Sequence, residues 1–461
     1  MSKSRAESAL DMSAPNPVLR KAMTMRYAVA LYMSSVLGSG VLVLPGLAAQ
    51  IAGPASLVAW AALSLISYPL AYTFASLSAR KPESGGVYSF ARESLGPGAA
   101  NAVGWLFILW YVTGAPAVTV IAASYLAYAF PLTRTEIFLI AGVLTLGAFL
   151  VNYRGVVVSS RVQLAVIIAI VGLLTTAVVA SAPSVNPANF TPFFPNGLVP
   201  IGVSAALIFW SYLGYENVSN VAEEFKNPEK DFHRSILFSV IVIGLLYISV
   251  AVATIGTKAY TAAGSVAPFA VILSNALGIY GAVGTAILAV IIIFGTMNAY
   301  TTGISRVIYA TAKDGGLPRL LDRVNPKSQV PDRSLMLLLG LSWTTLLLFY
   351  AFDVPLKTEL LIPSGAAILV YIIGSNSGIK LLKIKGAKKL FPWISLAISI
   401  IMLSFVGWSL LISLTLALLG FLYRRRGPPR AQVTPNPGAK NTGLPIRLSR
   451  LGDRSAEDIH W

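Results

Sequence analysis

The sequence predicts an all-α polytopic membrane protein, and three observations support that fold class. Hydrophobic residues make up 56% of the 461 residues and charged residues only 11%, and the mean hydropathy is +0.72. A soluble chain of this length cannot bury so much apolar surface. The apolar residues also run on for about 20 positions at a time, the length that a helix needs to cross a bilayer. A membrane barrel would instead alternate apolar and polar residues.

These apolar runs predict twelve membrane-spanning helices. The spans are 27–50, 55–79, 98–129, 135–151, 162–181, 199–222, 235–257, 268–305, 334–352, 359–379, 390–406 and 408–423. The last two come from one apolar run, which we divide near Gly407 so that the basic cluster after it stays on the side of the other cationic loops. Residues 1–25 and 424–461 are then polar tails around a membrane domain over 26–423.

The distribution of positive charge predicts the orientation. With the N-terminus in the cytoplasm, all of the 35 Lys and Arg except Arg134, Lys258 and Lys357 fall in cytoplasmic loops and tails. Because positively charged loops remain inside, both termini are expected in the cytoplasm and the location is the cytoplasmic membrane. Topology thus explains the net charge of +17, so no nucleic-acid partner is expected. The expected partners are membrane lipids, with the basic tail lying near anionic lipid.

The first and sixth spans both carry helix-weakening residues at mid-membrane depth. Gly38-Ser39-Gly40 lies in the first, and Ser211-Tyr212-Leu213-Gly214-Tyr215-Glu216 lies in the sixth. An unpaired backbone group in hydrocarbon is costly, so breaks at this depth call for a role. Such interruptions at matching positions of two halves indicate the binding site of a secondary transporter. We predict an inverted repeat of five plus five spans, about 26–181 and about 199–383, followed by two extra helices over about 390–423.

A helix broken at mid-membrane suits a small zwitterion such as an amino acid. N–H groups at the start of the outer half-helix favour a carboxylate, and carbonyls at the end of the inner half favour an ammonium group. We assign Gly38, Ser39 and Gly40 to the carboxylate, and the carbonyls of Ser35 and Val36 to the ammonium. The same small residues would also permit close helix packing without a ligand.

The sixth span supplies further candidate groups. We assign Trp210, Ser211, Leu213 and Gly214 to the substrate site. Trp210 either closes over the ligand as a gate or packs within the bundle. Glu216 is the only one of the 18 acidic residues deep within an apolar segment, and such a residue is a functional candidate by default. It either carries a coupling proton or bonds neighbouring helices.

Neither a cofactor nor a catalytic centre is predicted. The chain has no cysteine, and its two histidines lie in a loop and a tail, so no acid–base pair or metal-ligand set is visible. Hydroxyls of Thr301, Thr302 and Ser305 offer a possible sodium site, although such groups usually bond their own backbone. The coupling ion is therefore H⁺ or Na⁺. A non-transporting amino-acid sensor is an alternative, although such a protein would be expected to carry a folded cytosolic domain and the two tails are short and polar. A channel is a second alternative, although occluding aromatic side chains such as Trp210 favour a carrier.

These residues resemble the amino acid–polyamine–organocation superfamily of transporters. The resembling stretches, in order, are Gly38-Ser39-Gly40-Val41 with Pro45, Ser84-Gly85-Gly86-Val87-Tyr88, Trp210-Ser211-Tyr212-Leu213-Gly214-Tyr215-Glu216, Glu224-Phe225-Lys226-Asn227-Pro228 and Asp314-Gly315-Gly316-Leu317-Pro318. Each of the loop stretches alone would pass for an ordinary turn. The resemblance implies a five-plus-five core with two extra helices and alternating access.

Within the superfamily the chain is similar to bacterial exporters of methionine and branched-chain amino acids. That resemblance implies an aromatic gate at Trp210, the acid of the sixth span at Glu216, and an aromatic substrate contact at Tyr300. One departure concerns coupling: proton-coupled cationic-type members carry a lysine near Ile170, whereas 162–181 contain none. The lack of an intramembrane Asp cluster favours a neutral, apolar substrate. Efflux, exchange and ion-coupled uptake of amino acids or polyamines all fit this fold.

Overall fold

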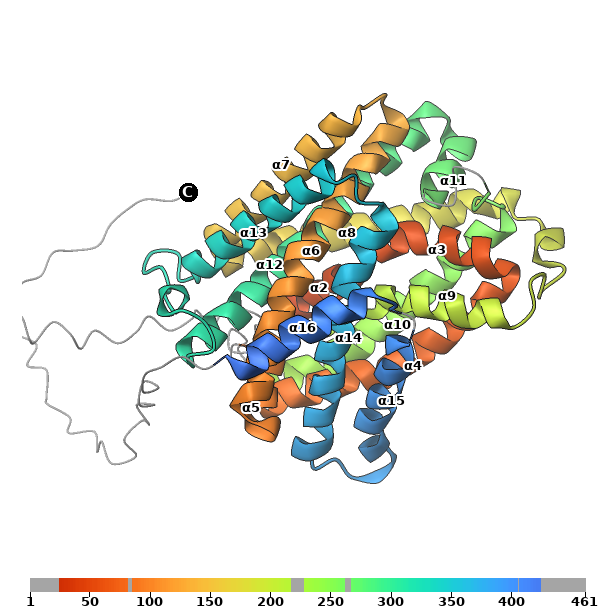
Figure 1. Ribbon diagram of the computed structural model, residues 1–461. Coiled ribbons are helices and arrows are strands. Elements are labelled where there is room, and N and C mark those ends of the chain that lie inside the picture. The colour runs from red at the N-terminus through yellow and green to blue at the C-terminus, as the bar shows by residue number, and fades with distance from the viewer. Residues whose placement is uncertain (1–24, 82–84, 217–227, 262–266, 405, 424–461) are drawn as a thin grey trace, which may run out of the picture. The chain divides into compact units, whose positions relative to one another are not determined.

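The computed structural model describes residues 25–81, 85–216, 228–261, 267–404 and 406–423, and the regular structure within them is entirely helical (Figure 1). These residues belong to one compact unit, which ends at Arg426. The predicted all-helical class is therefore confirmed for the described part of the chain. The two tails, and the Glu224–Pro228 stretch up to Asn227, lie outside it.

The α-helices in chain order are α2 (Met25–Val36), α3 (Ser39–Ala52), α4 (Ser56–Arg80), α5 (Val87–Leu95), α6 (Pro97–Ala129), α7 (Arg134–Tyr153), α8 (Val156–Ser181), α9 (Val199–Phe209), α10 (Pro228–Gly256), α11 (Pro268–Leu277), α12 (Ile279–Lys313), α13 (Asp332–Ala351), α14 (Leu356–Leu381), α15 (Phe391–Leu403) and α16 (Ser409–Leu422). Two short 3₁₀ helices used below are η5 (Trp210–Tyr212) and η9 (Gly386–Leu390).

Local sequence explains where several helices begin. Proline stands at the first or second position of α6, α11 and α15, where its missing N–H costs no helical hydrogen bond. At the start of α7, the Thr133 N–H donates to the Glu136 carboxylate over 2.7 Å, and the Glu136 N–H donates back to the Thr133 hydroxyl over 3.3 Å. This capping box satisfies two backbone donors that the helix leaves unpaired.

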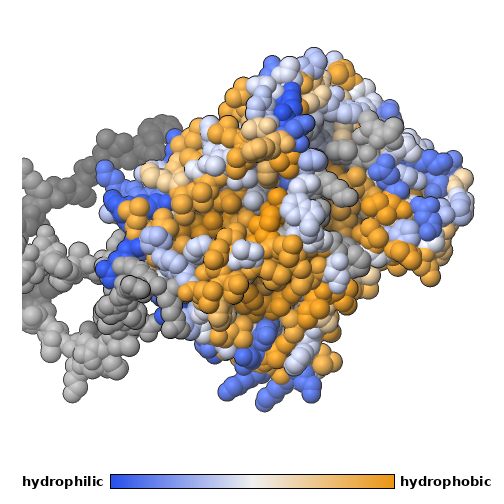
Figure 2. Space-filling view, in the orientation of Figure 1, coloured by the Kyte–Doolittle hydropathy of each residue, from blue (hydrophilic) through white to orange (hydrophobic). Residues whose placement is uncertain are grey.

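Within the described residues, nine helical stretches are long and apolar enough to cross a membrane. Three apolar helices are shorter, over Val199–Tyr212, Pro268–Leu277 and Leu410–Leu422. Side chains on the outer face are apolar as well: Leu65 is 77% exposed and Ile168 67%. Figure 2 shows this hydrophobic surface extending across the middle of the visible face. Such exposure fits contact with lipid and would be unusual in water.

One span boundary was predicted wrongly. The sequence analysis treated 268–305 as one segment, but α11 ends at Leu277 and α12 continues to Lys313. Gly278 separates them with φ = +60°, a conformation that glycine adopts without steric cost. Hydropathy alone does not distinguish a glycine that makes a turn from a glycine that allows two helices to pack closely. The division expected near Gly407 coincides with the break between α15 and α16, where that glycine has φ = +70°.

The interior is organised around α6 and α12, which pack against each other. α6 also contacts α13, α14 and α16, while α12 contacts α7, α8 and α2. α4 lies along α10, and α3 lies along α9. α3 and α9, which adjoin the two predicted breaks, are therefore neighbours.

Candidate functional site

The first span is broken where the sequence predicts. α2 ends at Val36, α3 begins at Ser39, and Leu37 and Gly38 between them are not helical. The Gly38 N–H bonds the Val36 carbonyl over 2.8 Å instead of continuing the helical pattern. The first N–H groups of α3 have no partner within their own helix. They place partial positive charge at the break.

The sixth span is interrupted as well. α9 passes into η5, Leu213 is extended (φ −78°, ψ 145°), and Gly214 has φ = +130°. Only glycine adopts this conformation readily, so the residue fixes where the helix stops. The rest of the predicted span, from Asn217, lies outside the described residues.

Glycines at the first break also permit close packing. A Cβ atom on Gly40 would lie 3.1 Å from Ser211 Cα and closer still to its hydroxyl. A Cβ on Gly38 would lie 2.6 Å from the hydroxyl of Thr296. The 2.6 Å distance is shorter than real Cβ contacts, and 3.1 Å is tighter than nine in ten of them, so these two positions bring the first break against the sixth span and α12. Close helix packing and close approach of a ligand thus both require a residue without a side chain at these two positions.

A small cavity of about 50 Å³ lies between the two breaks. Seven of the predicted substrate residues line it: Val36, Gly38, Gly40, Trp210, Ser211, Leu213 and Tyr300. Gly214 does not line it, and the side chains of Ser35 and Ser39 lie outside the described part of the structure.

Sequence reasoning missed one wall of the cavity. α6 contributes Trp110, Tyr111, Gly114, Ala115 and Val118. The Trp110 ring lies 5.4 Å from the ring of Tyr300, centroid to centroid. The neighbouring Tyr111 hydroxyl is 2.5 Å from that of Thr301. Two adjacent aromatic residues one turn before a Gly and a Pro in the third span were the available signal. Thr296 and Met297 of α12, which complete the lining, carry no comparable signal.

Tyr247 of α10 joins the two breaks. Its buried hydroxyl lies 2.8 Å from the Val36 carbonyl and 2.9 Å from the Ser211 carbonyl. One hydroxyl has one proton, so it donates to one of these carbonyls at a time. Val36 O also accepts the Gly38 N–H. The carbonyl that we assigned to the ammonium group therefore already has protein partners.

Glu216 is fully buried beside the sixth-span break. Tyr371 of α14 donates its hydroxyl proton to Glu216 Oε2. The Gly214 N–H lies 2.9 Å from the same oxygen and 2.9 Å from the Tyr371 hydroxyl. Glu216 Oε1 has no hydrogen-bond partner among the described residues. This acid therefore ties α14 to the non-helical segment of the sixth span.

The hydroxyls considered for sodium already have protein partners. Thr301 donates to the Met297 carbonyl over 2.7 Å, and Thr302 lies 2.8 Å from the Asn298 carbonyl and 2.5 Å from Asn152 Oδ1. The Ser305 hydroxyl lies 3.0 Å from Arg306 Nη1. Among the described residues, no group of three or more His, Cys, Asp or Glu is arranged to hold a metal ion. The sodium site stays a prediction.

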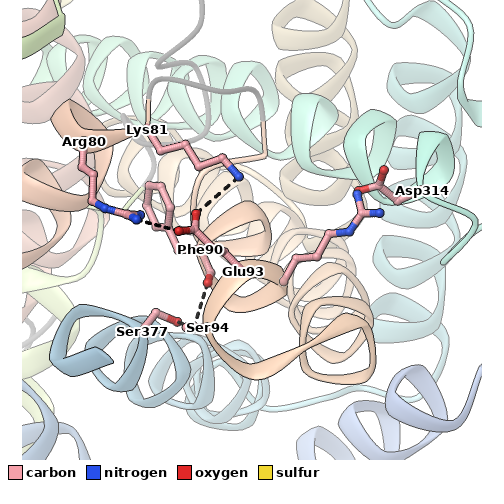
Figure 3. A network of polar contacts seen from close by, with 8 residues as sticks. Arg80, Lys81, Phe90, Glu93, Ser94, Asp314 and Ser377 are labelled. Carbon is pink, nitrogen blue, oxygen red and sulfur yellow. Dashed lines mark hydrogen bonds and ion pairs between the residues drawn. The ribbon is translucent and has the colours of Figure 1, made fainter. Parts of the chain in front are cut away.

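Two loop stretches that are far apart in the sequence meet at one end of the bundle. Arg92 of α5 forms an ion pair with Asp314 at the end of α12. Glu93 pairs with Arg80 at 2.6 Å and with Lys81 at 3.4 Å. The Ser94 hydroxyl donates to that of Ser377 on α14 over 2.9 Å. Figure 3 shows α5 at the centre of this network.

The same network has an electrostatic consequence at Glu93. The hydrogen bond from Arg80, followed by the charges of Arg80 and Lys81, holds the pKa of the Glu93 carboxyl below its ordinary value despite partial burial. Consecutive residues of α5 thus attach this helix to α4, α12 and α14. The Gly85-Gly86 stretch precedes α5, and the Asp314-Gly315-Gly316 stretch follows α12. The two turns therefore lie beside the same interface, the one that the Arg92–Asp314 ion pair forms between α5 and the end of α12.

Two adjoining helix breaks around a central cavity, inside a bundle of helices long and apolar enough to cross a membrane, are the arrangement of a membrane permease. The chain belongs to the amino acid permease family of the amino acid–polyamine–organocation superfamily, because the sequence model described as "Amino acid permease" matches residues 24–440. The protein is accordingly a transporter, and the resemblance stated from the sequence is confirmed.

Curated relatives agree with the family. The chain is 33% identical over 412 residues to the uncharacterized amino acid permease YecA of Bacillus subtilis, covering 89% of this chain and 96% of the relative. It is 30% identical over 429 residues to the L-methionine/branched-chain amino acid exporter YjeH of Escherichia coli, covering 90% and 99%. The branched-chain amino acid permease BcaP of Bacillus subtilis is 30% identical over 65% of this chain and 68% of its own length.

Proposed function

We propose that this protein is a secondary active transporter of neutral, apolar amino acids of the methionine or branched-chain type. The observation that carries the proposal is the cavity between the two breaks. Backbone groups lie at one side of it, and apolar or aromatic side chains such as Val118, Leu213 and Met297 form most of the rest, together with Ser211 and Thr296. The described lining residues include no Asp, Glu, Lys or Arg.

The chemistry of the lining separates neutral from charged substrates. The α-carboxylate and α-ammonium groups can be bound by backbone dipoles, as at other broken membrane helices. A charged side chain would then lie among apolar groups without a partner, which costs far more than burying a hydrocarbon side chain. The names of the relatives YjeH and BcaP, an exporter and a permease, support branched-chain substrates and leave efflux, exchange and uptake as modes to test.

An inverted repeat accounts for the pattern of helix contacts. If α2–α3, α4, α6, α7 and α8 correspond to α9–η5, α10, α12, α13 and α14, contacts should recur with the members exchanged. The contact between α6 and α14 is matched by the contact between α12 and α8. The contact between α6 and α13 is matched by that between α12 and α7, and the contact between α2 and α10 is matched by that between α9 and α4. These exchanged pairs support five plus five spans and alternating access about the central cavity.

The proposed setting is the cytoplasmic membrane with both termini inside. The bias of Lys and Arg toward alternate loops supports that orientation. The proposed domain division is a tail over 1–25, the transporter over 26–423 and a basic tail over 424–461. A coupling proton at Glu216 and a sodium ion at Thr301 and Thr302 remain alternative coupling proposals.

Counterflow in proteoliposomes tests the function without knowledge of the coupling ion. Vesicles are preloaded with unlabelled leucine or methionine, and entry of the labelled amino acid is followed. We expect transient accumulation that external valine, isoleucine or methionine suppresses and arginine does not. No accumulation by folded protein would contradict amino acid transport, and suppression by arginine would contradict a neutral substrate.

A further inference from the structure

The connection between α14 and α15 carries a dense group of positive charge. Lys383, Lys385, Lys388 and Lys389 are all exposed there. Residues 382–394 contain no Asp or Glu, and no ion pair joins these four lysines to an acid among the described residues. We call these four side chains the lysine cluster. An anion bound beside them would relieve their mutual repulsion.

Part of the lysine cluster is held against an aromatic surface. Lys388 Nζ lies 5.0 Å from the centre of the Tyr72 ring, a cation–π distance. The Tyr72 ring in turn meets Phe391 edge to face at 5.3 Å, and Phe391 meets Tyr68 at 5.6 Å. The lysine is thus positioned by α4 and α15 together, unlike a freely solvated side chain.

Exposed apolar side chains continue directly from the lysine cluster. Leu390 is 52% exposed, Trp393 56% and Ile394 38%. Leu390 ends η9, and Trp393 and Ile394 lie in the first turn of α15. Together η9 and α15 form the stretch Gly386–Leu403, which is apolar and long enough to cross a membrane. Figure 2 shows hydrophilic residues along the lower edge of the hydrophobic surface, where Figure 1 draws the α14–α15 connection. The cluster therefore lies where a membrane helix enters the bilayer, the level at which tryptophan is enriched.

We propose that the lysine cluster and the exposed start of α15 form a binding site for an anionic phospholipid. The lysines contact the headgroup phosphate, and an acyl chain lies along Leu390 and Trp393. Juxtamembrane groups of Lys and Arg attract anionic lipids by about 1 kcal/mol per residue. A soluble anion would use the charge but gain nothing from the adjoining apolar side chains, which favours a lipid. The site is separate from the central cavity and does not depend on which substrate is carried.

Lipid retention tests the proposal on the full-length protein. The protein is purified from mixed micelles of phosphatidylglycerol and phosphatidylcholine, and the phospholipids that remain bound are counted by native mass spectrometry. The test variant replaces Lys385, Lys388 and Lys389 with Gln. A matched control replaces Arg319, Arg323 and Lys327 with Gln. These three residues are exposed on the connection between α12 and α13, so the control removes the same amount of positive charge at another place. A third variant replaces the three lysines with Arg.

We expect the wild type to retain phosphatidylglycerol over phosphatidylcholine, and the Lys→Gln variant, which lacks three lysines, to lose this preference by about a hundredfold. The control and the Lys→Arg variant should keep it. Equal retention of both lipids by the wild type, or equal losses in the test and control variants, would overturn the proposal. Displacement of the lipid by glycerol phosphate alone would show a soluble-anion site instead. If the Lys→Gln variant does not fold, single Lys389→Gln and Lys388→Gln variants, expected to lose severalfold each, decide the matter.

Discussion

The Tyr247 hydroxyl lies 2.8 Å from the carbonyl oxygen of Val36, at the end of the inner part of the first span. The same hydroxyl is 2.9 Å from the Ser211 carbonyl in the sixth span. The hydroxyl has one proton and donates to one of these carbonyls at a time, and Val36 O also accepts the Gly38 N–H. A single side chain from a third, continuous helix thus links the two breaks.

Removing this hydroxyl should weaken substrate binding. We expect Tyr247→Phe to cost about 1 kcal/mol or more, because one buried hydrogen bond is lost and a carbonyl loses its partner. That corresponds to roughly a fivefold or greater rise in the substrate concentration for half-maximal counterflow. Tyr280→Phe is the matched control, since Tyr280 is 84% exposed on α12. Equal kinetics in both variants would mean that Tyr247 does not support the site.

Contact between Gly40 and Ser211 predicts a second, steric effect. Gly40→Ala should reduce transport strongly and destabilise the protein by about 1–3 kcal/mol, because the added methyl group overlaps Ser211. Gly284→Ala is the control, since a Cβ there would meet nothing within 4 Å. Adding Ser211→Gly to Gly40→Ala should restore part of the stability, measured as the melting temperature in detergent. A harmless Gly40→Ala would contradict the close approach of the two breaks.

The breaks themselves could be predicted because their signal is local. Gly38 and Gly214 weaken a helix by their own chemistry, and a polar acid at Glu216 is conspicuous within an apolar run. The cavity wall on α6 was missed because the only signal there, the adjacent Trp110 and Tyr111 before a Gly and a Pro, does not say which face of the helix turns inward. Which face of that helix turns inward depends on its contacts with α12 and α14, and one sequence does not record those contacts.

Glu216 gives a third prediction that separates two roles. Both of its described donors, the Gly214 N–H and the Tyr371 hydroxyl, approach one carboxyl oxygen, which is the arrangement of a group that positions the loop. We expect Glu216→Gln and Tyr371→Phe to lower the rate of flux to similar degrees and to leave the shape of its pH profile unchanged. A profile flattened by Glu216→Gln, but not by Tyr371→Phe, would make Glu216 the carrier of the coupling proton.

Stability at acid pH should depend on Glu93. Its pKa is lowered in the folded protein, chiefly by the Arg80 hydrogen bond, so the folded state binds this proton less readily than the unfolded state. The contribution of the carboxylate to stability is complete above its ordinary pKa of 4.5 and is lost as the pH falls through the lowered value. We expect Glu93→Gln to remove this part of the acid dependence of the melting temperature and to lower the melting temperature at neutral pH. An acid response identical to that of the wild type would exclude Glu93 as a contributor.

The ion pair between Arg92 and Asp314 should be specific in its partners. The two side chains are 39% and 24% exposed, and exposed pairs typically contribute about 0.2–1 kcal/mol. Arg92→Asp or Asp314→Arg alone sets like charges face to face, so we expect each to reduce both flux and stability. The double exchange restores opposite charges with the positions reversed, and it should recover much of the loss at low salt and less at high salt. Losses that simply add in the double variant would show that α5 and the end of α12 are held together by packing, with no measurable contribution from this pair.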